Sequence, residues 1–174
     1  MALSYDQILQ NAVDYFRIYV YPYLVVLAIA FLTTGFALFL VGRAKRHALK
    51  GKLRAELRIN VKVTRAILAY ADAQLAGGTS VAPMPTYKTR AFREYSNAGL
   101  IQKIPHKIAD ELEQVYLSMV SVNKAGRRQE DLAFGPAAAF PNAHTLRLEN
   151  LTYARDTAHN IIEPYQDRLM DIKL

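Results

Sequence analysis

The sequence contains no cysteine. The chain therefore forms no disulfide, thiolate metal site or cysteine nucleophile, and this composition suits a reducing compartment. The sequence also lacks β-type alternation, internal repeats, serine nucleophile elbows and glycine-rich phosphate or dinucleotide loops. Its four histidines are not spaced as metal ligands. We expect no catalytic, cofactor-binding or metal-binding residue, and a protein that is not an enzyme.

Charge is absent from one long stretch. Between Arg17 and Arg43, the 25 positions 18–42 carry no charged side chain. About 20 apolar residues span the hydrocarbon core of a bilayer, so this run predicts a transmembrane helix. A buried core helix would rarely need so many uncharged positions in a chain of 174 residues. A cleaved signal peptide would have a shorter apolar stretch and a basic start, whereas residues 1–17 are net negative.

Acidic residues are scarce directly after this run. Residues 43–65 hold nine Lys or Arg and only one acid, Glu56, whereas residues 66–174 hold 12 of each sign. The chain's excess charge of +7 therefore lies beside the predicted span. Because Lys and Arg flanking a membrane helix stay on the cytoplasmic side, we expect a bacterial inner membrane location with the N-terminus outside. Residues 43–174 would then be cytoplasmic.

The N-terminal segment, residues 1–17, predicts a short amphipathic helix over 5–16 on the outer face. Ser4 and Gln7 have the spacing of a capping box at its start. Tyrosines gather at the outer end of the span, and aromatic rings favour the headgroup boundary. The residues assigned to this aromatic belt are Tyr15, Tyr19, Tyr21 and Tyr23.

After the span, residues 43–75 predict a basic juxtamembrane helix with an apolar stripe, and residues 76–174 a cytoplasmic helical domain. The stripe consists of Leu49, Leu53, Leu57, Val61, Thr64, Leu68, Ala71 and Leu75. Glycines and prolines in 76–85 end this helix, and further helices are expected over 87–98, 105–123 and 143–171. Pro164 should bend or divide the last one. The predicted fold is all-α: one transmembrane helix continuing into an amphipathic basic helix and a small antiparallel bundle.

The basic residues after the span exceed what topology requires. We expect the first four, Arg43, Lys45, Arg46 and Lys50, to bind headgroups of anionic lipids. Lipid charge is screened over about 8 Å, so Arg54, Arg58 and Lys62, farther along the helix, are assigned to acidic protein. A bend at Gly42 or Gly51 would instead lay them on the bilayer, and a merely solvated face is the other alternative. Nucleic acid is not expected as a partner.

An apolar stretch, 134–141, lies in a predicted loop of residues 124–142. Phe134 and Phe140 are assigned to partner binding, the alternative being that the loop packs under its own domain. The layout resembles many bacterial membrane proteins in architecture and transfers no active residues. We expect a non-enzymatic accessory or scaffold subunit bound to integral membrane proteins of a larger inner-membrane complex, electron transfer and photosynthesis being candidates. The alternative is a membrane-anchored signalling or regulatory protein, and self-association is left open.

Overall fold

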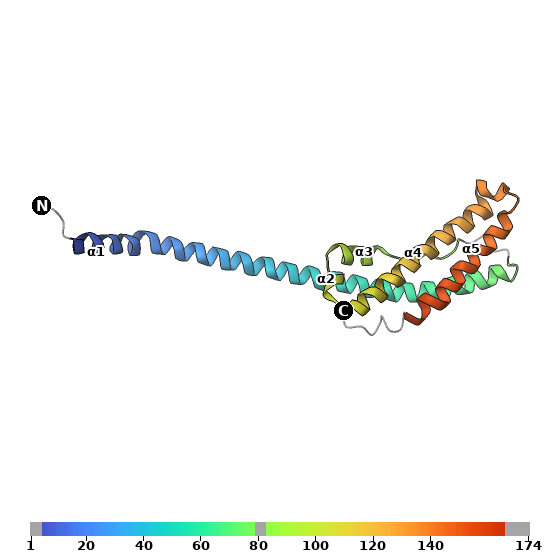
Figure 1. The fold of residues 1–174 in the computed structure, drawn as a ribbon, viewed down its shortest axis with the longest axis horizontal. Coiled ribbons are helices and arrows are strands. Elements are labelled where there is room, and N and C mark those ends of the chain that lie inside the picture. Colours follow the sequence, from blue (N-terminus) through green and yellow to red (C-terminus); the bar gives the residue numbers. More distant parts are fainter. Residues whose placement is uncertain (1–4, 79–82, 166–174) are drawn as a thin grey trace. The chain divides into compact units, whose positions relative to one another are not determined.

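The computed structural model describes residues 5–78 and 83–165, and the regular structure in these ranges is helical without any strand (Figure 1). This confirms the all-helical expectation and the long apolar helix near the N-terminus. The chain divides into two compact units, Met1–Arg46 and His47–Leu174, which we describe separately.

The first unit contains α1 (Tyr5–Tyr15), a π-helical turn η1 (Phe16–Val20) and the beginning of α2 (Tyr21–Leu75). α1 matches the predicted helix over 5–16, whereas the predicted cap Ser4 lies outside the described residues. Nearly every side chain from 5 to 41 is exposed. Within the described residues, one helix is long and apolar enough to cross a membrane, as judged by length and composition.

Both π-helical turns stand just before a proline. η1 ends two residues before Pro22, and the turn η4 (Ala158–Ile162) ends two residues before Pro164. Proline has no backbone N–H, and its ring crowds the carbonyl four residues earlier, so a wider turn accommodates it. The chain around Pro164 remains helical to Tyr165. Of the predicted bend or division at Pro164, the described residues therefore show no division. The rest of the predicted helix over 143–171 lies outside the described residues.

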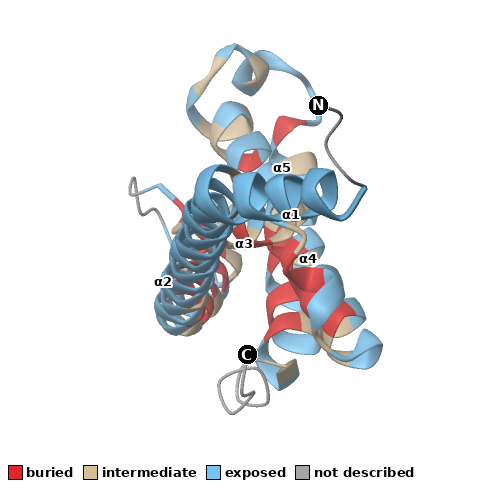
Figure 2. Cartoon of the chain, turned by 90° about the vertical axis from the view of Figure 1, so that its left-hand side faces the viewer, coloured by how far each residue is buried: buried red, intermediate tan, exposed pale blue. Residues whose placement is uncertain are grey.

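The second unit holds the rest of α2, α3 (Arg90–Asn97), η2 (Ile101–Lys103), α4 (His106–Phe134), η3 (Pro136–Ala139), α5 (Ala143–Thr157) and η4. Its buried apolar side chains form one cluster that draws on α2, α3, α4, α5 and η4. Figure 2 shows the buried positions as red bands along α4 and α5. Removal of this apolar surface from water is the main source of stability for such a cluster.

The buried face of α2 is more polar than the predicted stripe. Val61, Leu68 and Leu75 are only partly buried, because the face turns towards polar residues that find partners elsewhere in the fold. The buried residues of α2 are Leu49, Leu53, Glu56, Leu57, Asn60, Thr64, Ile67, Ala71 and Gln74.

The predicted loop over 124–142 is wrong in its first half. α4 continues to Phe134, and only Gly135–Asn142 connects it to α5. The added turns bury Ala125, Gly126 and Gln129, and the amide of Gln129 donates a hydrogen bond to the Tyr70 hydroxyl at 3.2 Å. Two small residues and a buried amide carry little hydrophobic signal, so the sequence pattern ended too early.

The predicted helix over 87–98 begins only at Arg90. Amide side chains of α2 and α4 hold the preceding backbone. Asn60 accepts from Lys88 N–H at 2.9 Å and donates to its carbonyl at 2.7 Å, and Asn123 makes the same pair of bonds with Tyr87 at 2.8 and 2.9 Å. These bonds replace the backbone partners that a helix would have supplied. We call residues 83–89 the strap.

Tyr87 makes the strap sensitive to alkaline pH. Burial raises the pKa of Tyr87 to about 12, and its hydroxyl donates a hydrogen bond to Thr64 Oγ1 at 3.0 Å. The side chain is neutral in both folded and unfolded states below about pH 9, so it adds no pH dependence there. Between pH 10 and 12 the unfolded chain ionises first, and the folded state loses about 2 kcal/mol relative to it.

We therefore expect Tyr87→Phe to lower the free energy of unfolding near neutral pH by about 1 kcal/mol, because the hydrogen bond to Thr64 is lost. Its stability should fall less steeply than that of the wild type between pH 10 and 12. The measurement is urea denaturation of the full chain in neutral detergent. Tyr153→Phe, at a half-exposed tyrosine, is the matched control. Identical alkaline slopes for the wild type and Tyr87→Phe would contradict this explanation.

Candidate functional site: a cationic groove between α2 and α3

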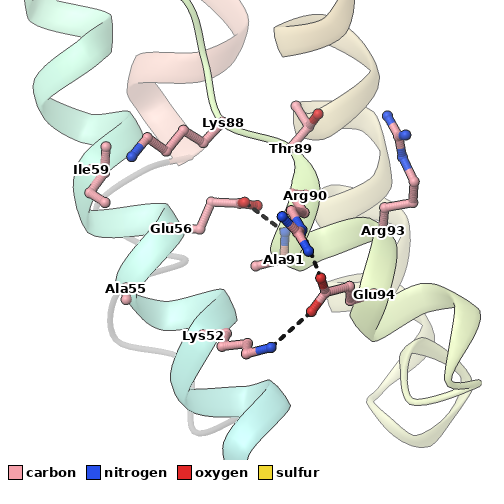
Figure 3. Close-up of a pocket in the computed structure, with 10 residues that line it drawn as sticks. All are labelled: Lys52, Ala55, Glu56, Ile59, Lys88, Thr89, Arg90, Ala91, Arg93 and Glu94. Carbon is pink, nitrogen blue, oxygen red and sulfur yellow. Dashed lines mark hydrogen bonds and ion pairs between the residues drawn. The ribbon is translucent and has the colours of Figure 1, made fainter.

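An open groove of about 660 Å³ lies between α2 and the start of α3 (Figure 3). Its floor is apolar and four basic side chains surround it. The lining residues are Lys52, Ala55, Glu56, Ile59, Lys88, Thr89, Arg90, Ala91, Arg93 and Glu94. The groove therefore brings basic residues of α2 together with a second set from residues 88–93.

Glu56 positions α3 at this groove. Its Oε2 accepts from the Ala91 N–H at 2.7 Å, and its Oε1 accepts from the Phe92 N–H at 3.1 Å. These are donors of the first helical turn, which have no partner within a helix, and Thr89 at the N-cap supplies no side-chain bond. A carboxylate there is also favoured by the helix dipole. A residue of α2 thus caps a helix 35 positions away in the sequence.

Tyr116 completes the environment of this carboxylate. Its hydroxyl donates to Glu56 Oε1 at 3.0 Å, and its ring stacks on Phe92 with centroids 4.1 Å apart. Burial, and next the Glu56 charge, raise the pKa of Tyr116 well above its ordinary value. Tyr116 therefore remains a hydrogen-bond donor at physiological pH, and the buried carboxylate has three donors.

Glu94 bridges two of the basic residues. Its Oε2 lies 3.1 Å from Lys52 Nζ and its Oε1 lies 3.0 Å from Arg90 Nε (Figure 3). The hydrogen bond from Lys52, followed by that from Arg90, lowers the pKa of Glu94. The bridge thus shows how one carboxylate satisfies cations from α2 and α3 at once.

Lys88 and Arg93 have no such neutralisation. Neither forms an ion pair with any residue in 5–78 or 83–165. Figure 3 shows the Lys88 side chain extending towards Ile59, whereas Arg93 points away from Glu56. Positive charge consequently remains at the groove after its internal bonds are counted.

The residues assigned to partner binding on α2 are exposed, and none of them lines this groove. Arg54, Arg58 and Lys62 follow one another at four-residue steps, and each step turns the row by about 40° around the helix. The row therefore winds around α2 instead of following one straight line. Among the described residues, Arg58, Lys62 and Arg65 form no ion pair.

The predicted headgroup residues are divided between the two units. Arg43, Lys45 and Arg46 are exposed in the first unit, whereas Lys50 is partly buried in the second. The predicted aromatic belt, Tyr15, Tyr19, Tyr21 and Tyr23, is exposed throughout, and the Tyr15 and Tyr19 ring centroids lie 5.0 Å apart.

Phe134 and Phe140 lie at the ends of α4 and η3, and neither lines the cationic groove. They are 61% and 59% exposed, so they do not pack inside their own unit. Phe134 lines a small separate cavity with Pro83 and Gly135. This connection therefore presents a second exposed surface.

Sequence reasoning missed Lys52, Lys88, Arg90, Arg93 and Glu94 as members of one site. Local signals existed, because three bases occur within residues 88–93 immediately before Glu94. Their connection with α2 was hidden, since it depends on the long-range bonds of Glu56 and Asn60. No group of three or more potential metal ligands of the His, Asp or Glu type occurs in the described part of the chain.

No protein-family model matches this chain, and no curated protein or solved structure is significantly similar to it. The class that the structure defines is an all-helical protein with one candidate membrane-spanning helix.

Loss of the Glu56 carboxylate should remove the hydrogen bonds that hold the start of α3 against α2. Glu56→Ala leaves two helix N–H groups and the Tyr116 hydroxyl without their partner, and we expect it to destabilise the fold by about 3 kcal/mol. Glu56→Gln, which retains one accepting oxygen, should cost less. Urea denaturation of the full chain in neutral detergent measures both. Glu113→Gln removes an exposed carboxylate from α4 and should unfold as the wild type does; equal stabilities for all variants would refute the capping role.

Proposed function

We propose that this protein is a non-enzymatic, single-pass membrane accessory or scaffold subunit of a larger inner-membrane complex. Residues 18–42 would anchor it, with the N-terminus outside. α2, α4 and α5 would form a small antiparallel cytoplasmic bundle that binds partner subunits. The observation that carries this proposal is an exposed apolar helix followed directly by a concentrated basic surface.

The first argument concerns the apolar side chains. Twenty-two large apolar residues between Tyr5 and Val41 are exposed, against five in the rest of the described chain. Exposing an apolar surface of this size to water would be unfavourable, whereas lipid chains or other membrane helices can cover it. Thr33 Oγ1 bonds to the Ile29 and Ala30 carbonyls, which satisfies its hydroxyl within the helix.

The second argument concerns the positive charge. Arg43 comes directly after the last residue of the span, where it favours retention on the cytoplasmic side and contact with anionic headgroups. Arg54 follows Gly42 by 12 helical residues, about 18 Å of helix at 1.5 Å per residue. That length exceeds the screening length of about 8 Å at physiological salt, which favours a protein partner for Arg54, Arg58 and Lys62.

The signalling alternative has less support. Dimerisation along the apolar stripe of α2 from Leu57 to Leu75 would favour this alternative, but Leu57 and Ala71 are 4% and 0% exposed within their own unit. A dimer formed there would have to replace existing core contacts. Subunit-type docking through exposed side chains, Phe134 and Phe140 included, has no such cost.

Membrane anchoring can be tested by alkaline carbonate washing of vesicles that contain the expressed chain. We expect the wild type to remain with the membrane. Leu27→Asp combined with Ile29→Asp should release it, since an aspartate at the centre of a span costs about 2.5–3.5 kcal/mol. Ile8→Asp with Leu9→Asp, made in α1, is the matched control and should stay bound. Release of the wild type would end the proposal.

The partner role can be tested by native purification in mild detergent. We expect stoichiometric membrane proteins to accompany the wild type, and Arg54→Gln, Arg58→Gln and Lys62→Gln together to lose them. The control replaces three exposed α4 cations, Lys107, Lys124 and Arg127, by Gln. A chain that purifies alone, or equal loss in both triple variants, argues against subunit binding through α2.

A further inference from the structure

We propose that the cationic groove between α2 and α3 binds an acidic, partly apolar segment of a partner protein. The inference rests on the proposed accessory role and names the chemistry of the partner. It adds Lys52, Lys88, Arg90, Arg93 and Ile59 to the binding surface.

Charge complementarity selects an anionic partner. Four cations line the groove, and the two carboxylates present are already committed: Glu56 to the α3 backbone and Glu94 to Lys52 and Arg90. Lys88 and Arg93 form no ion pair within the described chain. Arg58 and Lys62 are further exposed cations of α2. Complementary charge of this kind accelerates and directs association between proteins.

The geometry favours several carboxylates over one small anion. A phosphate at a helix N-terminus uses the free backbone donors there. The N–H groups of Ala91 and Phe92 already donate to Glu56 at 2.7 and 3.1 Å, so an arriving phosphate would not find them free. Recognition must instead come from side chains spread over α2 and residues 88–93. The Glu94 bridge shows that a carboxylate fits between such cations.

The floor of the groove favours a partner that also carries apolar residues. Ala55, Ile59 and Ala91 line it, and Ile59 is 38% exposed. An isolated exposed isoleucine needs no explanation by itself, but here it lies among basic side chains inside a concave surface. A leucine of an acidic segment would cover it and remove its apolar surface from water.

Substitution of Glu94 should change the affinity for the partner in the opposite direction to substitution of the cations. Glu94 occupies Lys52 and Arg90, and thus competes with an incoming carboxylate for them. Glu94→Gln should make both cations available and tighten binding. Lys88→Ala with Arg93→Ala should weaken it, because these two cations have no other ion-pair partner within the described chain.

The probe is a short fluorescent peptide in which glutamate alternates with leucine, titrated against the full chain in neutral detergent micelles. Fluorescence anisotropy measures Kd. We expect the double variant at Lys88 and Arg93 to bind about tenfold more weakly and Glu94→Gln about threefold more tightly. A peptide with glutamine for glutamate should bind none of these three proteins. Lys124→Ala with Arg127→Ala removes equal charge from α4 and should leave Kd unchanged.

Unchanged thermal unfolding of the variants shows that the fold is retained. Arg93→Lys, which preserves the charge, should retain much of the affinity that Arg93→Ala loses. Equal affinity of the wild type and the double variant, or no gain in Glu94→Gln, would overturn the proposal. So would binding of phosphatidylglycerol vesicles through Lys88 and Arg93 without peptide binding, which would assign the groove to lipid. If carbonate releases the chain from the membrane but the chain still binds the peptide, only the proposed membrane anchor is refuted.

Discussion

One buried carboxylate determines how the basic residues of this protein are arranged. Glu56 is 6% exposed, and removing a charge from water is unfavourable unless hydrogen-bond donors replace the water. Two backbone N–H groups of α3 and the Tyr116 hydroxyl serve as those donors. The requirement brings α3 against α2, and α3 in turn places Arg90 and Arg93 at the groove that Lys52 also lines. The groove is therefore a consequence of satisfying a single buried charge.

The strap extends this principle to neutral side chains. Asn60 on α2 and Asn123 on α4 each bond to both the N–H and the carbonyl of one strap residue. Amide side chains are suited to this, because they present a donor and an acceptor together. A one-turn shift of α2 against α4 would leave these groups unpaired, so they select the observed register more sharply than apolar contacts would.

The exposed surfaces of the two units differ in the environment that suits them. Side chains of residues 18–42 are apolar and exposed, whereas the outer face of α2 and the edge of α3 are basic and exposed. In our proposal lipid covers the first and acidic protein covers the second. The first surface then attaches the chain to the membrane, and the second selects the partner. Substitutions in different parts of the chain can therefore alter one role without the other.

The sequence by itself determined the features that depend on neighbours along the chain: the uncharged run 18–42, the excess charge in 43–65 and the helical class. Only the tertiary structure decided where α3 begins, that α4 reaches Phe134, and which cations share a groove. The reason is that Glu56, Asn60 and the amide nitrogen of Gln129 form hydrogen bonds with partners between 28 and 60 positions away. Their polarity makes them look exposed in the sequence, whereas long-range hydrogen bonds allow them to be buried.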